Sequence, residues 1–317
     1  MNHRLSLAHV EQAMSLIDPV FLHTPQYRAE SLDAVLGCRL VVKVETANPI
    51  RSFKGRGASY LMAGVPAGAE LICASAGNFG QAMAYACRSK GARLIVYASV
   101  NANSLKVERM RDLGAEVRLF GDDFDAAKIE ARRAAQVRGV RLVEDGCDAA
   151  TGEGAGTIGL ELLQWPEPLD AVLVPLGNGA LVTGVGRWVK GTSAATTMVA
   201  IAAAGAPAMV ESWRSGTIIE HSTVHTIADG IAVRIPVPEA VADMQGTVDD
   251  ALLVGDDAMM KAVRLLHQHL GLVVEPSGAG GVAALLEHPA RFAGRTVATI
   301  LCGGNLTPQQ VREWLSC

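Results

Sequence analysis

Residues 171–184 read AVLVPLGNGALVTG, and this stretch decides the fold. Ala171–Pro175 is a continuous apolar run, which is typical of a strand buried on both faces. The glycines at 177 and 179 allow close backbone approach and a positive φ, and the residues after them suit a helix. A buried strand that turns through glycines into a helix is the repeating unit of α/β proteins with parallel sheets.

The same alternation recurs over most of the chain and predicts a doubly wound α/β fold with two open, twisted, mostly parallel sheets flanked by helices. Short, mostly apolar runs predict the other strands at Leu40–Glu45, Glu70–Ala74, Arg93–Ala98, Glu116–Phe120, Arg141–Glu144, Met198–Ala203, Leu272–Glu275 and Thr296–Cys302. Capping residues and terminal glycines predict helices at Gly80–Lys90, Ser104–Leu113, Asp123–Arg138 and Asp256–Leu270, and a short last helix at Pro308–Leu315.

The length of 317 residues suits about two domains. We expect a large cofactor-binding domain formed by residues 1–50 and 146–317 and a small substrate-loop domain formed by residues 51–145. The turn-rich segment 140–156 is expected to cross between them. The active site is expected between the two domains, where the strand ends of both sheets meet.

The composition excludes several classes of partner. The net charge is −4 and the basic residues are scattered, which argues against nucleic acid or an anionic membrane as a partner. The N-terminus lacks a signal-peptide pattern, and the longest apolar run, Met198–Val210, is broken by glycine and proline. The six cysteines form no CxxC pair, so we expect reduced thiols in a cytoplasmic protein, and no zinc site or disulfide framework.

Four predicted strand ends carry unusual residues, and ligands bind at such strand ends in open α/β sheets. The turn at Pro175–Gly184 leads into a helix whose free N–H groups and dipole suit an anion, most naturally a phosphate. No GK[ST] follows, and no GxGxxG follows the first strand, so a P-loop or a nicotinamide cofactor is not indicated. The alternative for this segment alone is a tight turn without a ligand. The other three segments are SAGNFGQ (75–81), EPSGAGG (275–281) and LCGGN (301–305).

The segments at 75–81 and 301–305 remain ambiguous when each is taken alone. Ser75, Asn78 and the backbone amides between them suit a carboxylate or an oxygen on a planar ring, but Asn78 also suits a simple helix cap. Cys302 lies beside two glycines at a strand end, and a buried thiol that only fills space is the ordinary interpretation.

Lys54 lies in NPIRSFKGRG (48–57), near the start of a predicted helix that Ser52 can cap. The helix dipole and the nearby Arg51 and Arg56 favour a neutral, nucleophilic amine. A solvated loop lysine is the alternative. A phosphate site, a carboxylate site and an activated lysine together suggest pyridoxal 5′-phosphate (PLP) held by the lysine as a Schiff base.

The motifs SFKGRGA, SAGNFGQAMAYA, TIADGIAV, EPSGAGGVAA and LCGGN occur in an order that resembles the serine/threonine dehydratase (ammonia-lyase) group. These are PLP enzymes of fold type II, which is the fold of tryptophan synthase β. The resemblance runs from about Leu5 to Asn305. It implies a PLP-dependent lyase that eliminates water from a β-hydroxy-α-amino acid such as L-threonine, L-serine or the bulkier phenylserine, and releases a 2-oxo acid and ammonia.

The resemblance also implies roles for individual residues. Lys54 is expected to carry the cofactor and act as the catalytic base, Phe53 to pack against the ring, and Cys302 to meet the pyridine nitrogen. Asn78 is expected to bind the ring hydroxyl. The phosphate is expected at Gly177, Asn178, Gly179, Ala180 and Leu181. The substrate carboxylate is expected near Ser75, Ala76, Gly77, Asn78 and Gln81.

Departures from the family pattern leave alternatives open. Phe79 replaces the usual histidine; it either only packs or reshapes the pocket toward a bulkier β-substituent. The phosphate loop reads GNGAL where GGGGL is more common. Ala76 replaces the second serine that serine racemases carry, so racemisation is disfavoured. A β-replacement enzyme usually shows KDR and TSGN instead. A non-catalytic PLP-binding protein is the remaining alternative.

Other properties rest on the resemblance or remain open. A cation near Asp229 and His225 is undecided. The chain ends soon after LCGGN, so we expect no regulatory domain and no inhibition by isoleucine. A homodimer is expected, with a small amino acid as the ligand.

Overall fold

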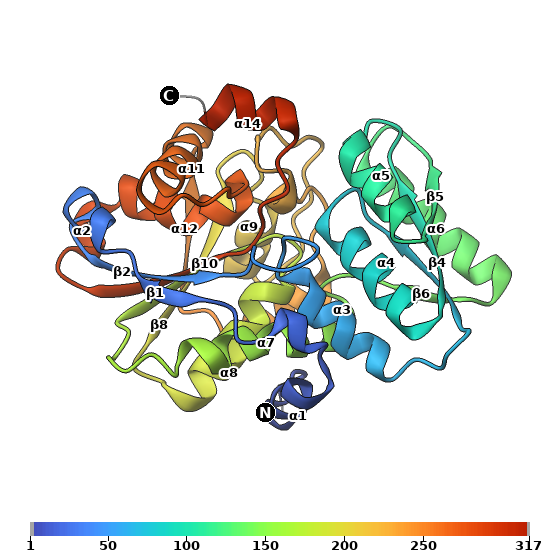
Figure 1. Cartoon of the computed structure of the whole chain (residues 1–317), viewed down its shortest axis with the longest axis horizontal. Helices are drawn as coiled ribbons and strands as arrows, with labels where there is room; N and C mark the ends of the chain where they lie inside the picture. Colours follow the sequence, from blue (N-terminus) through green and yellow to red (C-terminus); the bar gives the residue numbers. More distant parts are fainter. Residues whose placement is uncertain (1–2, 316–317) are drawn as a thin grey trace.

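A computed structural model describes residues 3–315, which form two open sheets with helices on both sides of each (Figure 1). The fold matches the α/β class that the alternating pattern predicts. One sheet has six strands and the other has four. None of the helices in the described part of the chain is both long and apolar enough to cross a bilayer.

The six-stranded sheet contains the first strands and the last strand of the chain. Its strands are Gln26–Arg28 (β1), Arg39–Val44 (β2), Ala171–Pro175 (β7), Thr197–Ala203 (β8), Asp250–Val254 (β9) and Thr296–Leu301 (β10). Their order is β1-β2-β10-β7-β8-β9, and all neighbours are parallel except the edge pair β1 and β2. The inner strands are buried on both faces, which explains their continuous apolar sequences.

The four-stranded sheet forms the lobe on the right of Figure 1. Its strands are Glu70–Ala74 (β3), Arg93–Ala98 (β4), Glu116–Leu119 (β5) and Arg141–Val143 (β6). It is entirely parallel and has the order β5-β4-β3-β6.

The helices divide between the faces of the two sheets. Their bounds are Leu7–Leu16 (α1), Glu30–Leu36 (α2), Lys54–Ala63 (α3), Asn78–Lys90 (α4), Ser104–Asp112 (α5), Phe124–Arg138 (α6), Ala149–Leu162 (α7), Ala180–Thr192 (α8), Ala208–Ser215 (α9), Pro238–Met244 (α10), Asp256–Leu270 (α11), Pro276–Glu287 (α12), Pro289–Phe292 (α13) and Pro308–Leu315 (α14). Short 3₁₀ turns occupy Pro19–Phe21 (η1) and Asp229–Ile231 (η2). In the large sheet, α2, α11, α12 and α14 pack on one face and α7 to α10 on the other. In the small sheet, α3, α4 and α5 share one core, and α6 covers the opposite face.

Two sequence predictions are wrong. Leu272–Glu275 is extended but joins no sheet; it connects α11 to α12 beside the end of β10, where Glu275 N donates to Gly303 O at 3.0 Å. The large sheet instead has the edge strand β9, which the sequence did not predict. The segment 140–156 is also less turn-rich than predicted, because its second half forms the first turns of α7.

The strands of the two sheets come from separate parts of the chain. All strands of the small sheet lie between residues 70 and 143, and those of the large sheet lie outside this range. The domain boundaries at 50/51 and 145/146 remain a prediction. Five described cysteines are free thiols, namely Cys38, Cys73, Cys87, Cys147 and Cys302; Cys317 lies outside the described residues.

Candidate active site

One cavity lies between the two sheets and is lined by loops from both. The small sheet contributes the loop 75–79 after β3, and the large sheet contributes 177–181 after β7 and Cys302 after β10. Phe53 and Lys54 complete the lining at the start of α3. Segments that are far apart in the sequence are therefore brought together at strand ends, as the motif positions predict.

Lys54 is the first residue of α3, and its amine faces the cavity. Its backbone N donates to Ser52 Oγ at 3.3 Å, but the N-cap of α3 is Phe53, so Ser52 contacts the helix start without being the N-cap that the sequence predicts. The preceding residue, Phe53, donates its backbone N to Cys302 O at 3.0 Å, which fixes the start of α3 to the end of β10. The Lys54 Nζ lies 4.6 Å from the centre of the Phe53 ring. The side chains expected to hold and to stack on a cofactor ring are therefore adjacent.

Asp145 contacts the Lys54 amine, although no sequence motif indicates it. Its Oδ2 accepts a hydrogen bond from Lys54 Nζ at 2.5 Å and another from Asn178 Nδ2 at 3.3 Å. Its Oδ1 is buried and has no hydrogen-bond partner among the described residues. Asp145 follows β6 and lies 91 residues from Lys54 in the chain. No local pattern marks it, because a lone aspartate after a strand is usually a turn residue.

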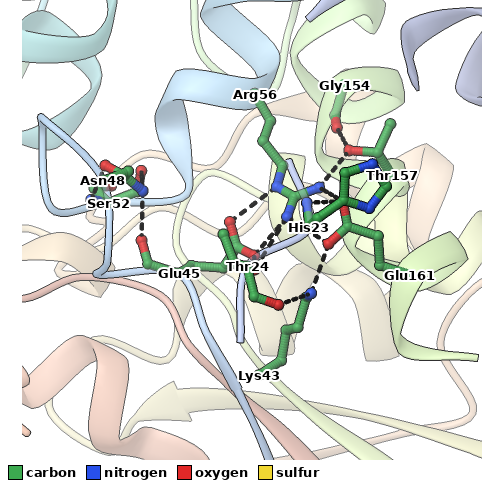
Figure 2. A network of polar contacts seen from close by, with 10 residues as sticks. All are labelled: His23, Thr24, Lys43, Glu45, Asn48, Ser52, Arg56, Gly154, Thr157 and Glu161. Atoms are coloured by element: carbon green, nitrogen blue, oxygen red, sulfur yellow. Dashed lines mark hydrogen bonds and ion pairs between the residues drawn. The ribbon is translucent and has the colours of Figure 1, made fainter. Parts of the chain in front are cut away.

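Arg56, two residues after Lys54, belongs to a separate buried network (Figure 2). Its guanidinium donates to Glu45 and to Glu161 at 2.8 and 2.7 Å, and Lys43 Nζ donates to the same Glu161 at 2.5 Å. The sequence predicts that the positive charge of Arg56 favours a neutral Lys54 amine. The structure shows instead that two carboxylates compensate Arg56, and that its role is to tie α3 to β2 and α7.

The loop at 177–181 has the features of an anion cradle. Gly179 is the N-cap of α8 with a φ of 98°, and no side chain caps the helix, so the first N–H groups face the cavity. A Cβ on Gly179 would lie 2.5 Å from Ala240 Cβ, and one on Gly177 would lie 2.6 Å from Gly230 O. Both glycines are therefore required by the close packing of this turn.

The loop at 75–78 is organised by Ser75, whose Oγ accepts hydrogen bonds from Gly77 N at 3.1 Å and Gly80 N at 2.9 Å. Ala76 and Gly77 line the cavity, and so does Phe79, whose ring centre lies 6.0 Å from Lys54 Nζ. Gln81 does not line it. Its side chain is buried in α4, and its Nε2 has no partner among residues 3–315.

Asn78 is held in a chain of polar contacts that the sequence motifs do not reveal. Its Nδ2 donates to Glu275 Oε1 at 2.7 Å, and its Oδ1 accepts from Asn305 Nδ2 at 2.8 Å. Arg109 Nη1 donates to Asn305 Oδ1. Burial raises the pKa of Glu275, against the lowering effect of Lys106 and Asn78. One N–H of Asn78 remains for a ligand. The motifs EPSGAGG and LCGGN contain Glu275 and Asn305, but only their contact with Asn78 shows their role.

Cys302 is buried, and its Sγ lies 3.9 Å from Ser277 O. Burial raises the pKa of this thiol well above its ordinary value, and Glu275 raises it further. A neutral thiol therefore faces the cavity at the end of β10.

Asp229 also lines the cavity, and it accepts a hydrogen bond from the buried Lys106 Nζ. Its charge is therefore compensated by a lysine. No cluster of three or more His, Cys, Asp or Glu side chains within residues 3–315 has the geometry of a metal site.

The residues of the cavity fit the expected PLP. The cradle at 177–181 has free amides and no room for a side chain at Gly177 or Gly179, which suits a phosphate. The Lys54 amine, the Phe53 ring and the neutral thiol of Cys302 lie in the same cavity and suit an aromatic aldehyde that carries a ring nitrogen.

Comparisons with known proteins agree with this site. The chain is 31% identical over 294 residues to a biosynthetic L-threonine dehydratase of Pasteurella multocida, with 91% of this chain and 57% of that protein aligned. It is 34% identical over 275 residues to an L-threonine ammonia-lyase of Geobacter sulfurreducens, with 86% of this chain and 68% of that protein aligned. The chain thus spans little more than half the length of the first of these relatives.

Solved structures show the same fold. The processed form of threonine deaminase isoform 2 from Solanum lycopersicum superposes with a TM-score of 0.88 and 27% identity, covering 98% of this chain and 89% of that one. Maize serine racemase superposes with a TM-score of 0.90 and 28% identity, covering 97% and 95%. The model of the family described as "Pyridoxal-phosphate dependent enzyme" matches residues 17–303. The chain therefore belongs to the pyridoxal-phosphate-dependent enzyme family, on the fold type II scaffold.

Proposed function

We propose that the protein is an ammonia-lyase that eliminates water from a β-hydroxy-α-amino acid and releases a 2-oxo acid and ammonia. The observation that carries this proposal is the convergence of Lys54, the uncapped helix start at 177–181 and the thiol of Cys302 on one cavity. Relatives named threonine dehydratase and threonine ammonia-lyase support it.

Each group has a task in this reaction. PLP, when bound, supplies an electron sink for the negative charge that forms at the substrate Cα. The backbone amides of 177–181 hold its phosphate, and Asn78 presents its remaining N–H to the ring oxygen. The loop 75–78 binds the substrate carboxylate. Lys54 Nζ, once released from the cofactor, removes the Cα proton.

Cys302 influences which reaction follows removal of the Cα proton. A neutral thiol, unlike a carboxylate, does not hold a proton on the ring nitrogen, so the cofactor withdraws electrons less strongly. A neutral Cys302 would thus favour loss of the β-hydroxyl over transfer of the amino group. Racemisation is less favoured, because Ala76 provides no proton donor in the loop that faces the substrate.

A substrate screen tests the proposal. The purified protein is checked for the visible band of bound PLP and then assayed for 2-oxo acid release from L-serine, L-threonine, D-serine and β-phenylserine. Oxo acid release from one of them identifies the lyase and its substrate, and the aromatic substrate tests whether Phe79 widens the specificity. A loaded enzyme that releases no oxo acid but interconverts enantiomers, or exchanges the β-substituent, contradicts the proposal.

We also propose that the protein is a cytoplasmic homodimer, as expected from the resemblance. Sedimentation of the PLP-loaded enzyme measures its mass directly. A mass of one chain, about 33.2 kDa, contradicts the dimer.

A further inference from the structure

Most of the charged side chains that line the active-site cavity are already compensated. Lys106 pairs with Asp229, and Arg234 Nη2 lies 2.9 Å from Asp125 Oδ2. Burial raises the pKa of Glu275, which favours its neutral form. These groups keep their partners when a cofactor binds, because none of the pairs involves Lys54.

Asp145 is the exception. The cation that pairs with it is Lys54, whose amine forms the proposed covalent bond to the cofactor. In the described part of the chain its only ion-pair partner is Lys54, at 2.5 Å. Once the Lys54 amine is attached to PLP, it no longer serves as a full ammonium partner. What remains is Asn178 Nδ2 at 3.3 Å, with Oδ1 buried and unpartnered. A carboxylate with 7% side-chain exposure then faces the cavity without a cation, which is unfavourable unless a ligand supplies one.

The position of Asp145 indicates which part of a substrate meets it. Its strand, β6, lies next to β3 in the small sheet, and the loop after β3 is the proposed carboxylate site. Asp145 contacts both Lys54, the proposed base, and Asn178 in the proposed phosphate cradle. It therefore borders the cavity next to the carboxylate loop and beside the proposed base, where the side chain of a substrate held by that loop can meet it.

We propose that Asp145 is a specificity-determining residue that selects substrates with an ammonium group on the side chain, at Cγ. This inference rests on the proposed function and narrows its substrate class to β-hydroxy-α-amino acids that carry a second amine, in preference to neutral or acidic ones. The diamino acids in the test below lack the β-hydroxyl and serve as binding probes. The ammonium group replaces that of Lys54 on Asp145 Oδ2 and supplies a donor to the unpartnered Oδ1. An acidic side chain at the same place would meet a like charge and is rejected.

Binding of isosteric pairs tests the proposal without depending on turnover. Dissociation constants are measured from the rapid change of the visible PLP band on mixing with L-2,4-diaminobutyrate or L-homoserine, and with L-2,3-diaminopropionate or L-serine. Each pair differs only by an ammonium in place of a hydroxyl. We expect the wild-type enzyme to prefer the diamino acid of at least one pair by tenfold or more, and to bind L-aspartate more weakly than L-asparagine.

Two variants assign the preference to Asp145. Asp145→Asn keeps the shape of the side chain and removes its charge, and it should reduce the preference at least tenfold. Asp123→Asn makes the same change at an exposed carboxylate outside the cavity, where asparagine still caps α6, and should leave the preference intact. Retention of the visible band shows that each variant is folded and loaded.

The outcomes separate the inference from the proposed function. Equal binding within both pairs in the wild type, or an unchanged preference in Asp145→Asn, overturns the role of Asp145. A clear preference for the diamino acid in an enzyme that releases no oxo acid from any substrate supports the inference and contradicts the lyase function.

Discussion

Arg56 Nη1 lies 2.7 Å from Glu161 Oε1, and both side chains are almost completely shielded from solvent. This pair joins the helix that begins with Lys54 to α7 of the large-sheet side (Figure 2). Because Arg56 is only two residues from Lys54, the direction of the lysine side chain depends on this buried pair. Stability and the geometry of the proposed active site are therefore linked through one residue.

Replacing Arg56 with methionine should destabilise the protein strongly. The change leaves Glu45 and Glu161 buried without their main cation, and breaking a buried pair in this way costs about 3–5 kcal/mol. Urea unfolding measures the loss. Arg133→Met is the matched control, since Arg133 is exposed and pairs only with Glu130 on the same helix. This control should change the free energy of unfolding by no more than about 0.5 kcal/mol. Equal losses in the two variants would show that the buried network stabilises the fold no more than a surface ion pair does.

The same network predicts a dependence of stability on acid pH. Burial by itself raises the pKa of Glu161, but the hydrogen bond and charge of Arg56, with those of Lys43, outweigh it and lower the pKa to about 2. The folded pKa is lower than the unfolded one, so this contribution is complete above the unfolded value of about 4.5 and is lost as the pH falls toward 2. The loss amounts to about 3 kcal/mol in total. Urea unfolding between pH 5 and 2 should show a shallower decline for Glu161→Gln, and parallel declines would refute the assignment.

Gly179→Ala should weaken the binding of PLP. The new Cβ would lie 2.5 Å from Ala240 Cβ, in a turn whose φ of 98° a side chain rarely adopts. The cradle must then shift, and we expect at least about a tenfold increase in the dissociation constant of PLP, measured by titrating the apoenzyme. Gly271→Ala imposes a similar backbone strain at φ 66° with nothing near its Cβ. If both variants weaken PLP binding equally, Gly179 has no specific role in holding the phosphate.

Cys302→Asp should add a transaminase side reaction. A carboxylate at this position favours a proton on the ring nitrogen and prolongs the life of the negative charge at Cα. Transfer of the amino group to the cofactor would then yield up to one equivalent of 2-oxo acid per active site without ammonia, because the nitrogen would stay on the cofactor. The two products are assayed together, and Cys302→Ser, which keeps a neutral group, should continue to release them in equal amounts. Equal amounts from Cys302→Asp would contradict the proposed role of the thiol.

The strand-turn-helix units could be predicted from the sequence, because buried parallel strands such as Ala171–Pro175 are continuously apolar and end in glycines. Leu272–Glu275 is also a short apolar run. Its contact with the end of β10 is the hydrogen bond from Glu275 N to Gly303 O, and it forms no ladder. The strand β9 was missed because its sequence, DALLV, is short and opens with an acid that pairs with Arg291 at the sheet edge. Local apolar runs do not reveal which segment finds a neighbouring strand.

The candidate site likewise contains residues that the sequence could predict and residues that it could not. Lys54, Asn78, the cradle at 177–181 and Cys302 lie in motifs, and they line one cavity. Asp145 lies in no motif; its role depends on a contact across 91 residues of chain, which only the folded structure provides. Gln81 is one helical turn from Asn78 but points into the core, which the spacing alone did not reveal.

The most direct test compares 2-oxo acid release by the wild-type enzyme and by Lys54→Ala, with each protein first reconstituted with PLP. We predict release of oxo acid and an equal amount of ammonia by the wild type with a β-hydroxy substrate. The variant should retain the fold and PLP binding in the cradle but release neither product. Undiminished release by Lys54→Ala would show that another group removes the Cα proton, and the assignment of the active site would be wrong.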